Sequence, residues 1–142
     1  MNNLKVIYIL SVTVLSGCAA GGASFVQPEP APVNEGLIYV YRPPQFQGSA
    51  LGVDVLADEK HFLTVDNGQF VAKTIAPGAH SFRSQSINID KATPIDVEPG
   101  KTYYLRFGIQ VGMWVSTLTL TEVTPRHAVN EMKECCKTGT DK

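Results

Sequence analysis

A β domain begins in this 142-residue chain with Leu37-Ile38-Tyr39-Val40-Tyr41. Aliphatic, β-branched and aromatic residues follow one another here without a polar break, and this composition is typical of β-strands. Pro43-Pro44 comes shortly afterwards. Because proline has no amide hydrogen for a sheet hydrogen bond, the strand is predicted to start after Gly36 and to end before these prolines.

Downstream of this strand, apolar residues recur at alternate positions between turn signals. Asp66-Asn67-Gly68 is the clearest of these turns, because Asn-Gly tolerates the positive φ that a two-residue type I′ hairpin needs. Pro77-Gly78 and Pro99-Gly100 match type II turns. The alternation predicts further strands over residues 51–57, 61–65, 69–75, 79–82, 94–97, 103–109 and 117–121.

A helix is predicted near the C-terminus. Thr124-Pro125 is typical of a helix start, with threonine as cap and proline at the first helical position. Val129, Met132 and Cys136 fall on one face, so we expect a short helix that ends near Cys135 and packs on the sheet. Seven or eight short strands with a C-terminal helix predict an all-β fold, an antiparallel β-sandwich. A small β-barrel is the alternative.

Upstream of the domain, Leu15-Ser16-Gly17-Cys18 follows a positively charged start at Lys5 and an apolar run over residues 6–15. This order is that of a signal peptide. The four residues resemble a bacterial lipoprotein box, whose cysteine is acylated with diacylglycerol and fatty acids such as palmitate. The alternatives are a transmembrane helix, which needs about 20 apolar residues, and an ordinary secretory signal. An aspartate directly after the cysteine resembles the signal that retains lipoproteins in the inner membrane. This chain has Ala19 at that position, which favours the outer membrane, with the domain facing the periplasm.

Four parts of the chain follow from these patterns. We expect a signal peptide over residues 1–17, a lipidated N-terminus and Pro-rich tether over 18–35, a β-sandwich over 36–136 and a flexible tail over 137–142. Alternate prolines keep the tether extended, and its 17 residues after the cysteine reach about 55–60 Å. Phe25 and Val26 are too few to give it structure.

Charge and cysteines limit the partners. The chain has 12 Lys and Arg, of which 11 remain without Lys5, against 13 Asp and Glu. Near-neutral charge without a basic cluster argues against nucleic acid, so membrane contact is left to the lipid anchor. Cys135 and Cys136 are neighbours whose Cα atoms lie about 3.8 Å apart, below the usual disulfide span of about 4.4–6.8 Å. Intermolecular bridges or surface thiols are therefore favoured over a redox or metal pair.

The sequence shows no pattern typical of a metal, cofactor or catalytic site. The histidines His61, His80 and His127 lack ligand partners at metal-like spacing. His80-Ser81 suggests a hydrolase, but Ser81 lies inside a predicted strand and lacks a Gly-x-Ser-x-Gly elbow. A non-enzyme is expected; the alternative is a lipid-anchored hydrolase or redox enzyme that uses His80 or the Cys135/Cys136 pair.

Two stretches are candidate contact sites. The first is a predicted turn that is unusually apolar, and core packing is favoured over an exposed patch for a partner or membrane. The second is the aromatic and basic strand end at Tyr41 and Arg42, for which a structural role is the alternative. The residues of the first stretch are Ile109, Val111, Met113 and Trp114.

The order of three motifs after the lipobox resembles the domain-of-unknown-function 2846 family of bacterial lipoproteins. They are Ile38-Tyr39-Val40-Tyr41-Arg42-Pro43, Pro77-Gly78-Ala79-His80 and Pro99-Gly100-Lys101-Thr102-Tyr103-Tyr104. The resemblance covers residues 36–134 and implies a β-sandwich lipoprotein domain without assigned catalytic residues. We therefore expect a membrane-anchored periplasmic lipoprotein with a non-catalytic domain, a binding or structural module whose partner is an envelope protein or glycan.

Overall fold

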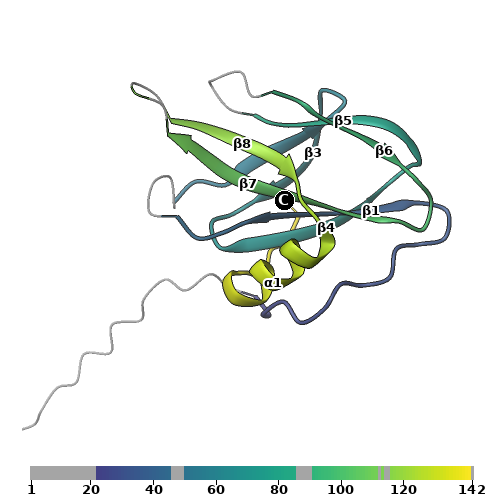
Figure 1. The fold of residues 1–142 in the computed structure, drawn as a ribbon, viewed down its shortest axis with the longest axis horizontal. Helices are drawn as coiled ribbons and strands as arrows, with labels where there is room; N and C mark the ends of the chain where they lie inside the picture. The colour runs from purple at the N-terminus through teal and green to yellow at the C-terminus, as the bar shows by residue number, and fades with distance from the viewer. Residues whose placement is uncertain (1–21, 46–49, 86–90, 112, 114–115, 142) are drawn as a thin grey trace, which may run out of the picture.

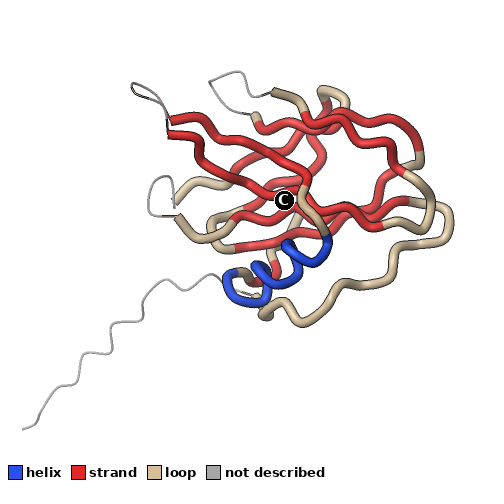
Figure 2. Tube along the Cα trace, viewed as in Figure 1, coloured by secondary structure: helices blue, strands red, loops and turns tan. Residues whose placement is uncertain are grey.

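Two β-sheets pack face to face, and one helix lies against the outside of one sheet (Figure 1). The computed structural model describes residues 22–45, 50–85, 91–111, 113 and 116–141, with the backbone only at positions 110, 111 and 116. These residues form nine strands and one helix, drawn in red and blue in Figure 2. The predicted β-sandwich with a short C-terminal helix is confirmed, in two separate sheets rather than a barrel.

The first sheet has five strands in the order β8-β7-β1-β4-β9. It is mixed rather than purely antiparallel. β1 runs antiparallel to β4 but parallel to β7. β1 and β7 therefore start at the same end of the sheet, where Leu37 lies opposite Thr102. The strands are β1 (Gly36–Arg42), β4 (Gln69–Ile75), β7 (Thr102–Val111), β8 (Ser116–Glu122) and β9 (Lys137–Thr138).

The second sheet has four antiparallel strands in the order β3-β2-β5-β6. Its inner side packs on the inner side of the first sheet, and alternate residues of both sheets fill the space between them. The strands are β2 (Val53–Ala57), β3 (Lys60–Val65), β5 (Gly78–Ser84) and β6 (Thr93–Val97).

β1 is buried on both faces, which explains why its sequence has no polar break. Ile38 and Val40 point into the core between the sheets. Leu37, Tyr39 and Tyr41 point the other way, into a second apolar cluster under the helix. Burying one large apolar side chain contributes about 1.5–3 kcal/mol, so this strand stabilises both layers.

The helix α1 (Pro125–Cys135) begins and ends where the sequence predicts. Thr124 occupies the cap position without a side-chain hydrogen bond, and proline stands in the first turn. Ala128 and Met132 are fully buried, and Cys136 is 3% exposed. These residues continue the cluster on the outer face of the first sheet, so the predicted packing of the helix is confirmed.

The predicted hairpin at Asn67-Gly68 is wrong, because β3 and β4 belong to different sheets. The turn passes from one layer to the other, and the Gly68 N–H donates to the carbonyl oxygen of Arg42 at 2.9 Å. Gly68 does have the predicted positive φ, 70°. The two-residue hairpin turn lies instead at Asp58 and Glu59, with φ of 50° and 65°, between β2 and β3. This pair of positive φ values is the type I′ pattern.

Gly68→Val is expected to lower the free energy of unfolding by about 1–2 kcal/mol, because a β-branched residue resists positive φ. Space is not the obstacle. A Cβ at position 68 would lie 3.7 Å from the Cβ of Pro44, an ordinary contact. Gly68→Asn is the control, since asparagine tolerates this conformation. Urea unfolding measures both variants, and equal midpoints for Val and Asn would contradict the assigned conformation.

Candidate functional site

The N-terminal segment lies on the outer face of the first sheet, beside α1 (Figure 1). Phe25 is 5% exposed. Its ring packs edge-on against Phe70 and Tyr39, at centroid distances of 5.1 and 6.1 Å. The Glu29 N–H donates to the Tyr39 hydroxyl at 2.8 Å. The prediction of a tether without contacts to the domain is therefore wrong for residues 22–31, because Phe25 and Ala31 pack on a cluster that only the folded sheet brings together.

The C-terminal tail lies between this N-terminal segment and β4. Lys137 and Thr138 form β9, which pairs with β4, and Ser24 pairs with Lys137 on the other side. The Thr138 N–H donates to the carbonyl oxygen of Ala23 at 2.7 Å. Gly22 approaches so closely, with φ of 112°, that a side chain there would collide with the Thr138 carbonyl. The predicted flexible tail is thus wrong for these residues, since the two ends of the domain hold each other.

A cleft of about 390 Å³ opens between the N-terminal segment and β4. Tyr39 and Phe70 are among its aromatic lining residues, and Glu29 and Asp141 add carboxylates. The Asp141 carboxylate is paired with the ammonium group of Lys73. The rings of Phe25, Tyr39 and Phe70 are buried and pack against one another, so they form the floor of the cleft rather than open faces for a ligand.

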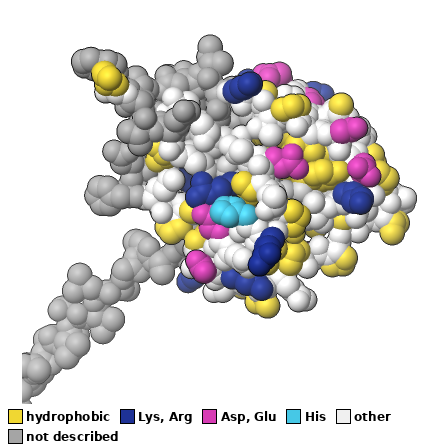
Figure 3. Space-filling view, viewed as in Figure 1, with side chains coloured by type: hydrophobic (Ala, Val, Ile, Leu, Met, Phe, Trp, Pro, Cys, Tyr) yellow, Lys and Arg dark blue, Asp and Glu magenta, His cyan; other side chains and the backbone are white. Residues whose placement is uncertain are grey.

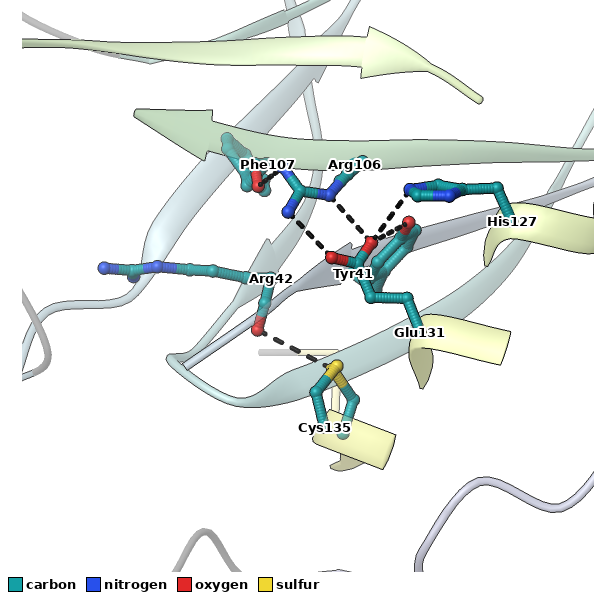
Figure 4. Close-up of polar contacts among 8 residues, drawn as sticks. Tyr41, Arg42, Arg106, Phe107, His127, Glu131 and Cys135 are labelled. Atoms are coloured by element: carbon teal, nitrogen blue, oxygen red, sulfur yellow. Dashed lines mark hydrogen bonds and ion pairs between the residues drawn. A yellow bond between two sulfur atoms is a disulfide. The ribbon is translucent and has the colours of Figure 1, made fainter. Parts of the chain in front are cut away.

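A polar network joins α1 to the first sheet (Figure 4). The Arg106 guanidinium donates two hydrogen bonds to the Glu131 carboxylate, both 2.7 Å. The Tyr41 hydroxyl donates a third, also 2.7 Å, and His127 Nε2 lies 3.4 Å from the same carboxylate. Bidentate pairs of this kind are the stronger class of hydrogen bond. The network fastens the helix over β1 and β7.

The electrostatics of this network keep Glu131 ionised. The hydrogen bonds from Arg106 hold the pKa of Glu131 below its ordinary value, against the opposing effect of burial. Burial, followed by the hydrogen bond to Glu131, raises the pKa of Tyr41. Glu131 is therefore a carboxylate whose acceptor sites are occupied by neighbours, and it holds no proton to donate. In the sequence, Glu131 could have been recognised as an acidic residue next to Met132, on the buried side of the predicted helix.

Tyr41 and Arg42 are not surface contact residues, which corrects that prediction. Tyr41 is fully buried and Arg42 is 2% exposed. The Arg42 guanidinium donates to the carbonyl oxygen of Leu51 at 2.7 Å, and burial lowers the pKa of Arg42. Both side chains are part of the protein interior, because β1 is covered on both faces.

Cys135 and Cys136 are joined by a disulfide. Cys135 is the last residue of α1, and Cys136 already has extended backbone, so the bond spans the point where the helix ends. The Cys136 sulfur lies 3.8 Å from the carbonyl oxygen of Arg42, and its partner Cys135 is labelled in Figure 4. The prediction of surface thiols or intermolecular bridges is wrong for this pair. An oxidised pair also has no thiolate to bind a metal.

His80 is held by acceptors on both ring nitrogens. Nδ1 lies 2.7 Å from the Asp58 carboxylate, and Nε2 lies 2.8 Å from the carbonyl oxygen of Ala76. Both partners accept hydrogen bonds, so both nitrogens carry hydrogens. The bond to Asp58 raises the pKa of His80 and lowers the pKa of Asp58. An imidazolium has no lone pair to take a proton from Ser81, which weighs against the hydrolase alternative.

This pair predicts a pH dependence of stability. The contribution of His80 is fully present below its unfolded pKa of about 6.5 and is lost as pH rises through its raised folded pKa. The contribution of Asp58 is present above about pH 4 and is lost as pH falls through its lowered folded pKa. We expect His80→Gln to lower the melting temperature more at pH 6 than at pH 9. The effect is small because the Asp58 side chain is 49% exposed; an equal loss at both pH values would contradict it.

The apolar turn after β7 is only partly described. Met113 is 91% exposed and Ile109 is half-buried. Val111 belongs to β7 by its backbone, its side chain is not described, and Trp114 lies outside the described residues. The favoured core packing is therefore wrong for Met113, because β7 runs five residues past Arg106, the last residue that pairs with β1.

Charges are dispersed over the visible surface. On the face in Figure 3, basic and acidic side chains are interspersed with apolar ones. Within the part of the chain that the structure describes, no three His, Cys, Asp or Glu side chains are grouped as metal ligands. Among the described residues, no helix is both long enough and apolar enough to cross a membrane.

Comparison with known proteins gives a family and one relative. Residues 32–118 match the model of a family described as "Protein of unknown function (DUF2846)". An uncharacterized protein of Haemophilus influenzae is 33% identical over 91 residues, which cover 64% of this chain and 53% of the relative. The chain thus matches about half the length of that relative. No solved structure matches. The family match starts before β1 and ends within β8, so it leaves α1 outside.

Proposed function

This chain belongs to the DUF2846 family, whose function is unknown, and from its own residues we propose that it is a lipid-anchored, non-enzymatic lipoprotein of the bacterial envelope. The domain faces the periplasm from the outer membrane. It acts as a binding or structural module, with an envelope protein or a glycan as its class of partner.

The lipobox Leu15-Ser16-Gly17-Cys18 is the observation that carries this proposal. The way the chain enters the domain supports it. Residues 22–24 are exposed, and Phe25 is the first buried residue described. An acylated Cys18 can therefore lie in a membrane without drawing a core residue out of the sandwich.

The non-enzymatic part of the proposal is supported by how the polar groups are used. Glu131 accepts hydrogen bonds from Arg106 and Tyr41. The His80 ring is held between two acceptors, and Cys135 is bonded to Cys136. Glu131, His80 and the Cys135–Cys136 pair are thus engaged in holding the fold together.

Cys18→Ala is expected to abolish lipid attachment, because no other residue of the box supplies a thiol. The test is labelling of cells with radioactive palmitate, followed by isolation of the protein. The double variant Cys135→Ser/Cys136→Ser is the control, since it changes the other two cysteines and should keep full label. Equal label in wild type and the Cys18→Ala variant would refute the lipoprotein proposal.

A further inference from the structure

We propose that the disulfide between Cys135 and Cys136 is a site of thiol–disulfide exchange, and that its reduction by a dithiol releases the N-terminal segment, residues 22–31, from the sandwich. This inference concerns the domain itself and does not depend on the lipid anchor proposed above. In an anchored chain, the release lengthens the free chain between Cys18 and the sandwich.

The length of the closed loop shows what this disulfide can fix. A disulfide constrains the unfolded chain more when it closes a longer loop. Cys135 and Cys136 are neighbours, so their bond closes the shortest loop that two cysteines can close and adds little to global stability through chain entropy. Cys135 ends α1 and Cys136 has extended backbone. The bond therefore restrains the junction between the helix and β9.

The two cysteines differ in accessibility. Cys135 is half-buried, whereas Cys136 is 3% exposed and belongs to the apolar cluster under the helix. Thiol–disulfide exchange begins when a thiolate attacks one of the two sulfur atoms. We therefore assign the Cys135 sulfur as the atom that is attacked.

The exchange proceeds in two steps. A thiolate of the dithiol bonds to the Cys135 sulfur, the bond to Cys136 breaks, and Cys136 leaves as a thiolate that takes up a proton. The second thiol of the reductant then displaces Cys135 from the mixed disulfide. The dithiol is oxidised to a disulfide, and the protein gains two thiols.

Cys136 is also an attachment point of the N-terminal segment. The Phe25 N–H donates to the Cys136 carbonyl oxygen at 3.2 Å, and both side chains lie in the same buried cluster. Lys137, the next residue, starts β9 and pairs with Ser24. A change at the junction therefore acts directly on the contacts that hold this segment.

Reduction favours local opening of the junction for two reasons. Without the covalent ring, the backbone at Cys135 and Cys136 regains torsional freedom when the junction opens. Two thiols also need more room than one disulfide, and the Cys136 side chain lies in a close-packed interior. Local opening involves the elements at the junction and leaves distant strands protected. We therefore expect β9 and the N-terminal segment to loosen while the second sheet stays intact.

The first measurement is a thiol count in the full Cys18→Ala chain, whose remaining cysteines are Cys135 and Cys136. Dithiothreitol is the dithiol, and it is removed before the count. We expect no thiols before treatment in native buffer and two per chain after it. Thiols that appear only in urea, or two thiols before treatment, overturn the proposal.

Amide hydrogen exchange of the same chain measures the release. We expect the amides of Phe25 and Thr138 to exchange at least about tenfold faster after reduction. The Asp58 amide, which donates to the Ser81 carbonyl oxygen in the second sheet, should be unchanged. Equal acceleration at Asp58 identifies a global stabiliser, and unchanged exchange at Phe25 shows no effect on the segment. Either result overturns the proposal.

Cys135→Ser in this chain is the matched variant, because it removes the half-buried sulfur and keeps the buried Cys136. Its Phe25 and Thr138 amides should exchange fast without reductant, and dithiothreitol should change them no further. Slow exchange in this variant contradicts the proposal. If the variant does not fold, the parent chain before and after reduction decides, since that comparison changes no residue.

Discussion

Phe25→Ala is expected to lower the free energy of unfolding by about 3–5 kcal/mol, the usual cost of removing a buried phenylalanine. The ring is 5% exposed and lies edge-on to Phe70 and Tyr39. Domains of this kind have about 5–15 kcal/mol of stability in total. Phe25, in a stretch with the composition of a linker, therefore accounts for a large share of the domain's free energy of unfolding.

Val26→Ala is the matched control for this prediction. Val26 is the next residue along the chain, is 73% exposed, and its truncation should change stability by no more than about 0.5 kcal/mol. Urea unfolding of the non-acylated Cys18→Ala chain measures both variants in one background. If Phe25→Ala were as stable as Val26→Ala, the N-terminal segment would be a free tether after all.

Glu131→Ala is expected to cost about 2–4 kcal/mol at pH 7, because it leaves the Arg106 guanidinium and the buried Tyr41 hydroxyl without their shared acceptor. The pKa of Glu131 is lowered by Arg106. Its contribution is therefore present above the unfolded pKa of about 4.3 and is lost as pH falls through the folded pKa. The difference between wild type and variant should shrink in acid.

Glu134→Ala is the control for Glu131→Ala, since Glu134 lies on the exposed side of the same helix. It removes the same charge and should cost no more than about 0.5 kcal/mol. Urea unfolding at pH 7 and at pH 3 compares the two variants. A cost for Glu131→Ala that matches Glu134→Ala, or that grows in acid, would contradict the role assigned to the network.

Local patterns predicted most of the secondary structure. Alternating apolar residues between turn signals indicated strands such as β4 at Gln69–Ile75. The Thr124-Pro125 pair indicated the start of α1 at Pro125. Both kinds of signal depend on residues close together in the chain. The strand over Leu37 to Tyr41 was found for the same reason. Its burial on both faces was not, since the N-terminal segment and α1 that cover it come from distant parts of the chain.

What the sequence did not show depends on contacts between distant residues. Asn67-Gly68 has the composition of a hairpin, but the neighbouring strands pair with partners in different sheets. Nothing local marks the parallel pairing of β1 with β7. The network at Glu131 joins side chains 90 and 25 positions apart. The buried position of Phe25 likewise needs rings from two other strands.

The intact mass of the protein isolated from the membrane fraction tests the central claim most directly. The lipoprotein account predicts a mature chain that starts at Cys18 and carries the mass of a diacylglycerol and an amide-linked acyl chain. A chain that keeps residues 1–17, or one that is cut after Cys18 and carries no lipid, would contradict it.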